Sequence, residues 1–165
     1  MPHLYLLRHA KSSWDDPTLA DRDRPLANRG REATARLARY AERTGVRPQL
    51  ALCSPARRTR ETLDAMRGAL GKRMQILYEE QLYMADVQEL IDRLRSVPAD
   101  VEAVIVVGHN PGMEHLLLRL GGHEAEREIG TKFPTGALAT LEVDGPWERL
   151  EHARLVDYVV PRNLT

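Results

Sequence analysis

A short apolar run near the start of the chain, residues 4–7, stops abruptly at Arg8 and His9. Such a run between polar residues is typical of a strand buried on both faces, as in a parallel sheet. Ligands of open α/β sheets bind beyond the carboxyl ends of the strands, where Arg8 and His9 would lie. A guanidinium beside an imidazole at that place suits a phosphate group.

Two further apolar runs end in polar clusters and lead directly into helices. Residues 50–53 precede Ser54-Pro55, and residues 103–107 precede Gly108-His109-Asn110-Pro111. We expect Ser54 and Asn110 to cap these helices, with each following proline at the first helical position. The carboxyl ends of the three strands should share one edge of the sheet. Two helix N-termini at that edge would favour an anion.

Three arginines, Arg57, Arg58 and Arg60, crowd the first turn of the second helix. The helix dipole disfavours cations there by roughly 0.3–1 kcal/mol each, so stability alone would favour Asp or Glu. For any single arginine, a side chain that extends into solvent is as good an explanation as a bound anion, and Glu61 could pair with Arg57. All three together, beside the two other clusters, favour a bound anion.

The remaining pattern alternates helices and strands, which predicts an α/β fold with a mostly parallel sheet. The connection of residues 11–28 is long for a structureless loop, so we expect it to be functional. Asp86 is the expected cap of the third helix. The further helices are expected over residues 29–43 and 87–97, and the further strands over residues 74–78, 137–143 and 150–160.

Composition narrows the possible classes of protein. The 165 residues are expected to form one domain, 1–165, and the net charge of +0 favours neither nucleic acid nor a membrane surface as a partner. No apolar segment approaches the roughly 20 residues of a membrane span. The start of the chain lacks the pattern of a signal peptide, and a single cysteine is compatible with a reducing compartment. We therefore expect a cytoplasmic location.

Two other chemistries are weighed against the anion site. In a cysteine phosphatase an arginine lies six positions after the nucleophile; Thr59 occupies that position after Cys53, and Arg58 comes one residue early. We therefore expect Cys53 to be a small buried hydrophobe. His109 and His115 lack the spacing of a metal-binding helix, and no glycine motif for nucleotides is present. No metal and no cofactor are expected.

At this point the chain resembles the histidine phosphatase superfamily, which has the phosphoglycerate mutase-like fold, and within it the small phosphohistidine phosphatases of the SixA type. The resemblance implies a three-layer α/β/α architecture with a mostly parallel central sheet and no large lid insertion. Arg8-His9-Ala10 departs from the Arg-His-Gly of the wider family in the way common in this branch. The matching segments are residues 7–12, 23–30, 54–58 with Glu61-Thr62, 108–111 and 133–136.

The resemblance implies a role for each matching residue. His9 would be the nucleophile that forms a phosphohistidine intermediate, while Arg8, Arg58 and His109 hold the phosphoryl oxygens. His9 must attack as the neutral imidazole, with one nitrogen free and the other held by a hydrogen bond, for which we expect a backbone carbonyl. The remaining residues of the matching segments expected to contact substrate are Lys11, Ser12 and Asn110.

The acid that protonates the leaving group is left open between three carboxylates. Glu80 fits the position of the family best, with Glu79 and Asp86 as rivals, although Asp86 already has a role as a helix cap. Asp15 is a separate question, because the phosphoglycerate mutases have asparagine there and a carboxylate facing phosphate is repulsive. It points away from the phosphate or binds a basic part of the substrate.

The size of the chain bears on the substrate. Only about 30 residues separate the second helix from the strand 103–107, which leaves little for a lid over a small sugar phosphate. An open pocket suits a phosphohistidine on another protein, which is the expected partner of a monomeric enzyme. The alternatives are a broad phosphatase of small esters, a mutase, or a phosphate-binding module without catalysis.

Overall fold

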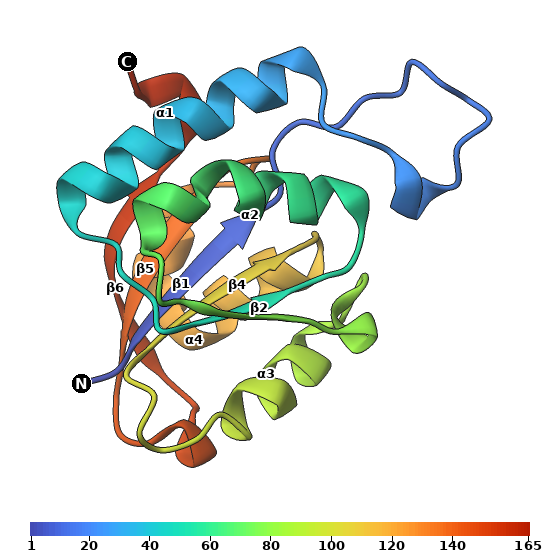
Figure 1. The fold of residues 1–165 in the computed structure, drawn as a ribbon. Helices are drawn as coiled ribbons and strands as arrows, with labels where there is room; N and C mark the ends of the chain where they lie inside the picture. Colours follow the sequence, from blue (N-terminus) through green and yellow to red (C-terminus); the bar gives the residue numbers. More distant parts are fainter.

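Six strands form one central sheet in the order β3-β2-β4-β1-β5-β6 (Figure 1). The computed structural model describes residues 1–165. The four strands β3, β2, β4 and β1 run parallel; at one edge β5 pairs antiparallel with β1, and β6 pairs antiparallel with β5. The mostly parallel sheet expected from the sequence is therefore confirmed. The strands are β1 His3–Arg8, β2 Leu50–Cys53, β3 Gln75–Tyr78, β4 Ala103–Gly108, β5 Leu138–Val143 and β6 Ala153–Val159.

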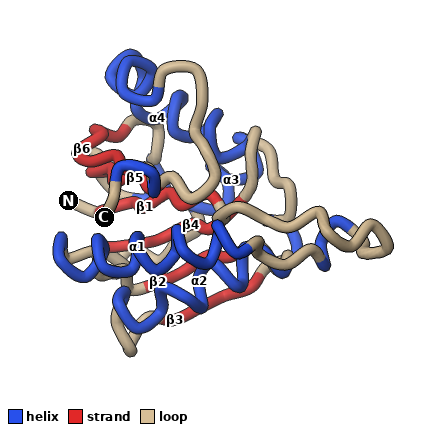
Figure 2. Tube along the Cα trace, turned by 90° about the horizontal axis from the view of Figure 1, so that it is seen from above, coloured by secondary structure: helices blue, strands red, loops and turns tan.

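Helices cover both faces of this sheet, as Figure 2 shows, so the molecule has three layers. Alternate residues of a strand point to opposite faces. Leu4 and Leu6 of β1 pack in the core that α3 and α4 cover, and Tyr5 and Leu7 pack in the core under α1 and α2. Burial on both faces explains the unbroken apolar run. The helices are α1 Asn28–Thr44, α2 Arg57–Leu70, α3 Val87–Arg95 and α4 Gly112–Ile129.

The start of α2 differs from the prediction. Ser54 is not its N-cap: the helix begins at Arg57, and Ala56 is the cap residue. The Ser54 hydroxyl is instead 2.8 Å from a ring nitrogen of His109, and it accepts a longer hydrogen bond of 3.3 Å from the amide of Ala56. The helix therefore starts three residues after Ser54, and the serine contacts His109 at the end of the neighbouring strand β4.

The predicted caps of the other helices have mixed outcomes. Asp86 caps α3 through a complete capping box with Glu89, as expected. The start of α4 was placed one residue too early, because Pro111 is the cap residue and the helix begins at Gly112. The amide oxygen of Asn110 nevertheless accepts a hydrogen bond of 3.2 Å from the amide of Glu114.

The long connection between β1 and α1 projects from the body of the molecule (Figures 1 and 2). It is not wholly irregular: Ser12 forms an isolated β-bridge with Leu26, and Asp21–Asp23 is a 3₁₀ helix. Its base is tightly packed, since a Cβ atom on Gly30 would lie 2.2 Å from the carbonyl oxygen of Lys11.

Between α2 and β4 the chain forms only β3, a short 3₁₀ helix at Glu80–Leu82, and α3. No large insertion is present there, as the sequence predicted. No helix of the protein combines the length and the apolar character that crossing a bilayer requires.

Candidate active site

The polar clusters that follow three strands meet at one edge of the sheet. Arg8 of β1 lies opposite Gly108 of β4, and Cys53 of β2 lies opposite Val107. The amide of His9 donates to the carbonyl of Gly108 over 3.2 Å. Pairing with β4 therefore brings the residues after all three strands together, as the sequence predicted.

Two histidine rings lie side by side at this edge. The ring centroids of His9 and His109 are 5.5 Å apart, and the ring planes are inclined by 54°. His9 is 6 % exposed and His109 is 3 % exposed. The Nδ1 atom of His9 lies 2.7 Å from the carbonyl oxygen of Ala10. Because a carbonyl only accepts, Nδ1 carries the proton and Nε2 is left with its lone pair; a backbone carbonyl therefore orients the ring, as expected.

The ring of His109 is held from two other directions. Its Nε2 atom is 2.8 Å from the hydroxyl oxygen of Ser54. The ring of Tyr83 packs against it edge to face, with centroids 5.4 Å apart. The Nδ1 atom of His109 is buried and has no hydrogen-bond partner. Such an atom is costly to leave unpaired, so it is free to take a partner from a ligand.

Both histidines are neutral at pH 7. Burial lowers the pKa of His9 to about 4, and the positive charges of Arg58, Arg8 and Arg24 add to this, against the opposing hydrogen bond to Ala10. Burial and then the charge of Arg58 lower the pKa of His109 to about 3. An imidazole with a lone pair is a nucleophile at neutral pH, and an imidazolium is not.

Three arginines surround the histidine pair. Arg8, Arg24 and Arg58 line the same cavity of about 400 Å³ as His9 and His109. The Nε atoms of Arg8 and Arg58 are buried without hydrogen-bond partners. The cavity has only one carboxylate to balance these three cations. Cationic groups with unpaired donors form a site for an oxyanion.

That carboxylate belongs to Asp21, which lies in the same cavity. Arg58 donates to it twice, from Nη1 to the main-chain oxygen over 2.8 Å and from Nη2 to the carboxylate over 3.0 Å. Tyr83 donates its hydroxyl to the same carboxylate. The hydrogen bond from Tyr83 is the main cause that lowers the pKa of Asp21 to about 2; burial opposes it, and the contacts with Arg58 lower the pKa further.

Sequence reasoning missed Asp21 and Arg24 as members of the site. Both lie in the long connection that was expected to be functional, and Arg24 belongs to a segment that matched the family. The buried guanidinium of Arg24 donates to the hydroxyl of Ser12 over 3.1 Å and contacts Asp21 at 3.3 Å. A cluster of opposite charges in a loop was the available signal, but it does not reveal which members turn inward.

The other expected substrate contacts also lie at the cavity. Lys11, Ser12 and Asn110 line it. Asn110 is held at both ends of its amide, since its nitrogen donates to the carbonyl of Phe133 over 2.8 Å and its oxygen serves α4. Ser12 is buried and Lys11 is exposed. These three residues therefore line the same cavity as the histidine pair.

The structure places none of the candidate acids at the cavity wall. Glu80 is exposed and pairs with Arg22 at 2.5 Å, Glu79 pairs with Arg93 at 2.6 Å, and Asp86 caps α3. Asp15 is also exposed and lines a neighbouring hollow rather than the cavity of His9. The carboxylate that reaches the cavity is Asp21.

Cys53 does not take part in the site, and the protein has no cluster of metal-binding side chains. The Cys53 side chain is fully buried, and burial raises its pKa to about 12. A thiol that stays protonated is a packing group rather than a nucleophile, as expected. No group of three His, Cys, Asp or Glu side chains lies close enough together to hold a metal ion.

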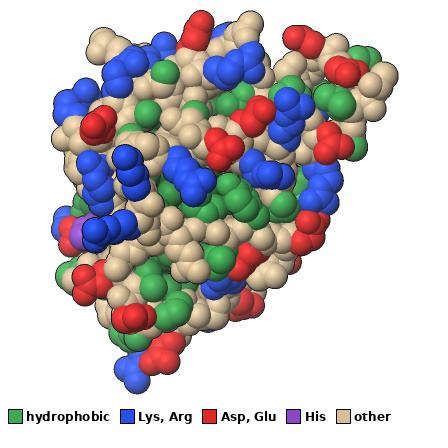
Figure 3. Space-filling model, in the orientation of Figure 1, with side chains coloured by type: hydrophobic (Ala, Val, Ile, Leu, Met, Phe, Trp, Pro, Cys, Tyr) green, Lys and Arg blue, Asp and Glu red, His purple; other side chains and the backbone are tan.

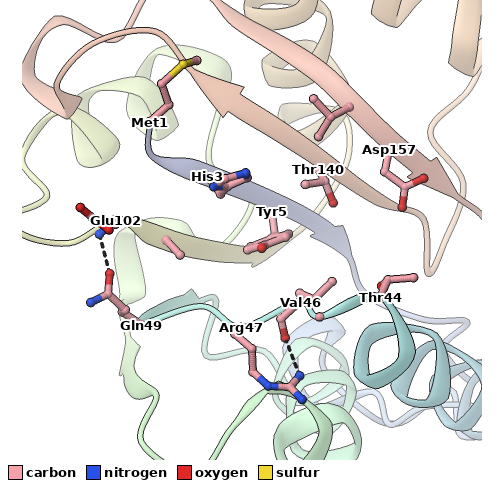
Figure 4. A pocket seen from close by; sticks show the side chains of 13 residues that line it. Met1, His3, Tyr5, Thr44, Val46, Arg47, Gln49, Glu102, Thr140 and Asp157 are labelled. Carbon is pink, nitrogen blue, oxygen red and sulfur yellow. Dashed lines mark hydrogen bonds between the residues drawn. The ribbon is translucent and has the colours of Figure 1, made fainter.

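A larger hollow of about 640 Å³ opens at the opposite ends of the parallel strands. Figure 4 shows His3 and Tyr5 on its floor, with Asp157 of β6 on one side and Arg47 on the other. The two aromatic rings stack with centroids 6.4 Å apart. This hollow is lined by one histidine and one arginine. The cavity of His9, with two histidines and three arginines, is therefore the better phosphate site.

Comparison with known proteins identifies the family of the chain. The family model of the histidine phosphatase superfamily (branch 1) matches residues 4–86. An uncharacterised protein of Mycobacterium leprae is 40% identical over 94% of this chain and 100% of its own. The chain belongs to the histidine phosphatase superfamily.

Solved structures define the type within the superfamily. A candidate phosphohistidine phosphatase SixA from Agrobacterium tumefaciens has a TM-score of 0.84 and 32% identity over 97% of this chain and 98% of that one. A second, from Nakamurella multipartitia, has a TM-score of 0.81 and 30% identity over 97% and 96% of the two chains. The chain is of the SixA type, and its membership of the superfamily supports a phosphatase.

Proposed function

We propose that this protein is a metal-independent phosphohistidine phosphatase that acts on another protein through a phosphohistidine intermediate on His9. The observation that carries the proposal is the state of His9. Its Nδ1 proton is engaged by the carbonyl of Ala10 at 2.7 Å, its pKa is lowered to about 4 by burial, and its Nε2 atom keeps the lone pair. That is the state a nucleophile requires.

The reaction proceeds in two transfers. In the first, a bond forms between Nε2 of His9 and phosphorus while the bond between phosphorus and the substrate imidazole breaks; the substrate ring carries a proton on its other nitrogen and therefore leaves as a neutral imidazole. In the second, water attacks phosphorus, the bond to Nε2 breaks, and phosphate leaves with both water protons. The Nδ1 proton stays on His9 throughout, so the ring is cationic while it carries the phosphoryl group, and the Ala10 carbonyl stabilises that charge.

Positioning and charge neutralisation provide the rest of the catalysis. The unpaired Nε atoms of Arg8 and Arg58 and the unpaired Nδ1 atom of His109 are donors for the equatorial oxygens. For Nδ1 of His109 to donate, Nε2 must accept a hydrogen bond, which the Ser54 hydroxyl at 2.8 Å can provide. An arriving dianion also opposes the arginine charges that lower the pKa of His109.

A strong acid is less necessary for this substrate than for an ester. The first transfer exchanges one bond between nitrogen and phosphorus for another, and an imidazole leaving group needs less protonation than an alkoxide. Glu80 remains our candidate acid, ahead of Glu79 and Asp86. Its pairing with Arg22 must open for it to reach a leaving group.

Two exposed apolar side chains at the cavity favour a protein substrate. Trp14 is 72 % exposed and Met84 is 47 % exposed, and both line the cavity of His9. The centroid of the Trp14 ring lies 3.5 Å from the guanidinium carbon of Arg24, and this cation–π contact holds the tryptophan at the cavity. Exposed Trp and Met side chains are typical of protein contacts, and no lid covers them.

The test uses peptides that carry a phosphohistidine and, separately, p-nitrophenyl phosphate. We expect release of phosphate from the peptide with a higher kcat/KM than from the ester, and a label on the enzyme that is labile in acid and stable in base. Turnover of the ester alone would instead assign the protein to the broad-specificity phosphatases. Binding of phosphate without turnover of either substrate would assign it to the phosphate-binding modules.

A further inference from the structure

A second hollow, of about 360 Å³, adjoins the cavity of His9 and is strongly basic. We call it the basic hollow and define it by its charged residues. They come from four separate parts of the chain: the loop after β1, one face of α1, the segment after α4, and the C-terminal 3₁₀ helix Pro161–Asn163, which packs beside α1 (Figure 1). These residues are Lys11, Arg29, Glu32, Arg36, Lys132 and Arg162.

None of the five cations of the basic hollow forms an ion pair. The ion pairs of the protein involve other arginines and one histidine, and the one carboxylate of the hollow, Glu32, pairs with none of the five cations. Arg36 is only partly exposed, and its Nε atom is buried without a hydrogen-bond partner. Gathered cations without partners repel one another, and an anionic ligand removes that cost.

This gathering is local, because the whole chain is neutral. Its 24 Lys and Arg residues are balanced by 24 Asp and Glu residues. On the face over α1 and α2, acidic side chains lie among the basic ones (Figure 3). The basic hollow has five cations to one carboxylate instead.

The basic hollow and the cavity of His9 share a wall. Lys11 and Thr135 line both. A phosphorylated side chain held at His9 therefore brings its neighbouring residues next to the hollow, within the reach of a few residues of extended chain.

We propose that the basic hollow is a docking site for an acidic segment of the phosphoprotein substrate, next to the phosphohistidine that enters the cavity. This proposal rests on the proposed function and adds the kind of substrate that the protein selects. Charge complementarity identifies the occupant: five unpaired cations, four of them exposed, attract carboxylates in water. A hollow lined mainly by polar groups does not favour an apolar segment.

The experiment compares two phosphohistidine peptides that differ only in charge. One has glutamates on both sides of the phosphohistidine, and the other has glutamines at the same positions. The variants are Arg29→Ala/Arg36→Ala on α1 and, independently, Lys132→Ala/Arg162→Ala, whose exposed side chains lie outside α1. Arg67→Ala, which removes an exposed arginine on α2 away from both cavities, is the matched control.

We expect the unmodified protein to favour the acidic peptide in kcat/KM by roughly tenfold, since each exposed charge pair contributes little alone and several act together. The preference falls towards one in both double variants, and it shrinks on raising salt from about 0.05 to 0.5 M. Arg67→Ala keeps it. Equal kcat/KM for the two peptides, or a preference that survives both double variants, overturns the proposal.

Binding of unphosphorylated peptides separates this proposal from the proposed function. Fluorescence anisotropy measures the affinity of the labelled glutamate and glutamine peptides without any turnover. If neither phosphopeptide is hydrolysed but the glutamate peptide binds more tightly and both double variants lose that difference, the docking site stands and the proposed activity fails. If the two peptides bind alike, the docking site fails whatever the activity.

Discussion

Arg58 donates hydrogen bonds to Asp21 from both of its terminal nitrogens, one to the main-chain oxygen over 2.8 Å and one to the carboxylate over 3.0 Å. These two residues are separated by 37 positions and belong to different elements, the long loop and the first turn of α2. The contact offsets the unfavourable position of a cation at a helix N-terminus. It also orients the guanidinium, whose Nε atom is buried without a hydrogen-bond partner.

Replacement of Arg58 tests its role in holding the phosphoryl group. We expect Arg58→Ala to lower kcat by roughly 10²–10³, the usual loss for one preorganised donor to a developing charge. Its neighbour Arg57 is exposed and pairs only with Glu61 at 2.9 Å, so Arg57→Ala should retain nearly full activity. Steady-state kinetics with a phosphohistidine peptide measures both, and the reverse order of damage would contradict the assignment.

Replacement of Asp21 tests whether it positions Arg58 or competes with the substrate. If it positions the guanidinium, Asp21→Ala should lower kcat/KM about tenfold, and Asp21→Asn, which keeps an acceptor oxygen, should lose less. Inhibition by orthovanadate should weaken in parallel. Tighter vanadate binding and a higher kcat/KM in Asp21→Ala would mean that the carboxylate occupies the place of the phosphoryl group.

Replacement of His9 tests the nucleophile. His9→Ala should remove turnover and covalent labelling together, because no other side chain at the cavity offers an imidazole lone pair held by a carbonyl. His115→Ala, at an exposed position of α4, is the matched control and should label normally. Labelled protein from the His9→Ala variant, detected after phosphopeptide incubation, would place the intermediate elsewhere.

The pH dependence of stability follows from the two buried histidines. In the unfolded chain a histidine has a pKa of about 6.5, and burial lowers the pKa to about 4 for His9 and about 3 for His109. The unfolded state binds more protons between these values, so the free energy of unfolding is greatest above pH 6.5 and falls as the pH is lowered.

The expected loss at pH 5 is roughly 2 kcal/mol for each histidine, measured by urea unfolding relative to pH 7.5. His109→Gln removes one of the two titrating groups, so the slope against pH should fall by about half. A free energy of unfolding that does not change over this range would show that the histidines are not buried as neutral groups.

Gly30 tests the packing that holds the loop against α1. A Cβ atom there would lie 2.2 Å from the carbonyl oxygen of Lys11, so Gly30→Ala should destabilise the protein by about 1–3 kcal/mol. Gly68 lies in α2 with nothing within 4 Å of an added Cβ atom, so Gly68→Ala should stabilise it by about 0.5–1 kcal/mol. Denaturant unfolding measures both; equal effects would contradict the packing argument.

The parts of the site that could be predicted lie at the ends of regular elements. Apolar runs located β1, β2 and β4, and the rule that parallel strands end at one edge brought Arg8, His9 and His109 together. The capping box at Asp86 was readable for the same reason, since all its partners lie within one turn.

The parts that could not be predicted depend on long-range contacts. Asp21 and Arg24 lie in a loop without periodicity; the contact with Arg58 of α2 places Asp21 at the cavity, and the hydrogen bond to Ser12 helps to hold Arg24 there. Ser54 looked like a helix cap because its hydrogen bond to His109 crosses 55 positions. Glu80 matched the family position of the acid, yet its side chain pairs with Arg22 of the long loop between β1 and α1.

The amino-acid sequence by itself indicated most of the elements, the mostly parallel sheet and the edge at which the polar clusters meet, because side-chain periodicity is local and an alternating order of strands and helices favours parallel strands that end at one edge. Only the tertiary structure decided which charges face His9 and which five cations gather without partners beside it. Those arrangements depend on how the long loop, α1 and the C-terminal segment pack together, and no local pattern encodes that packing.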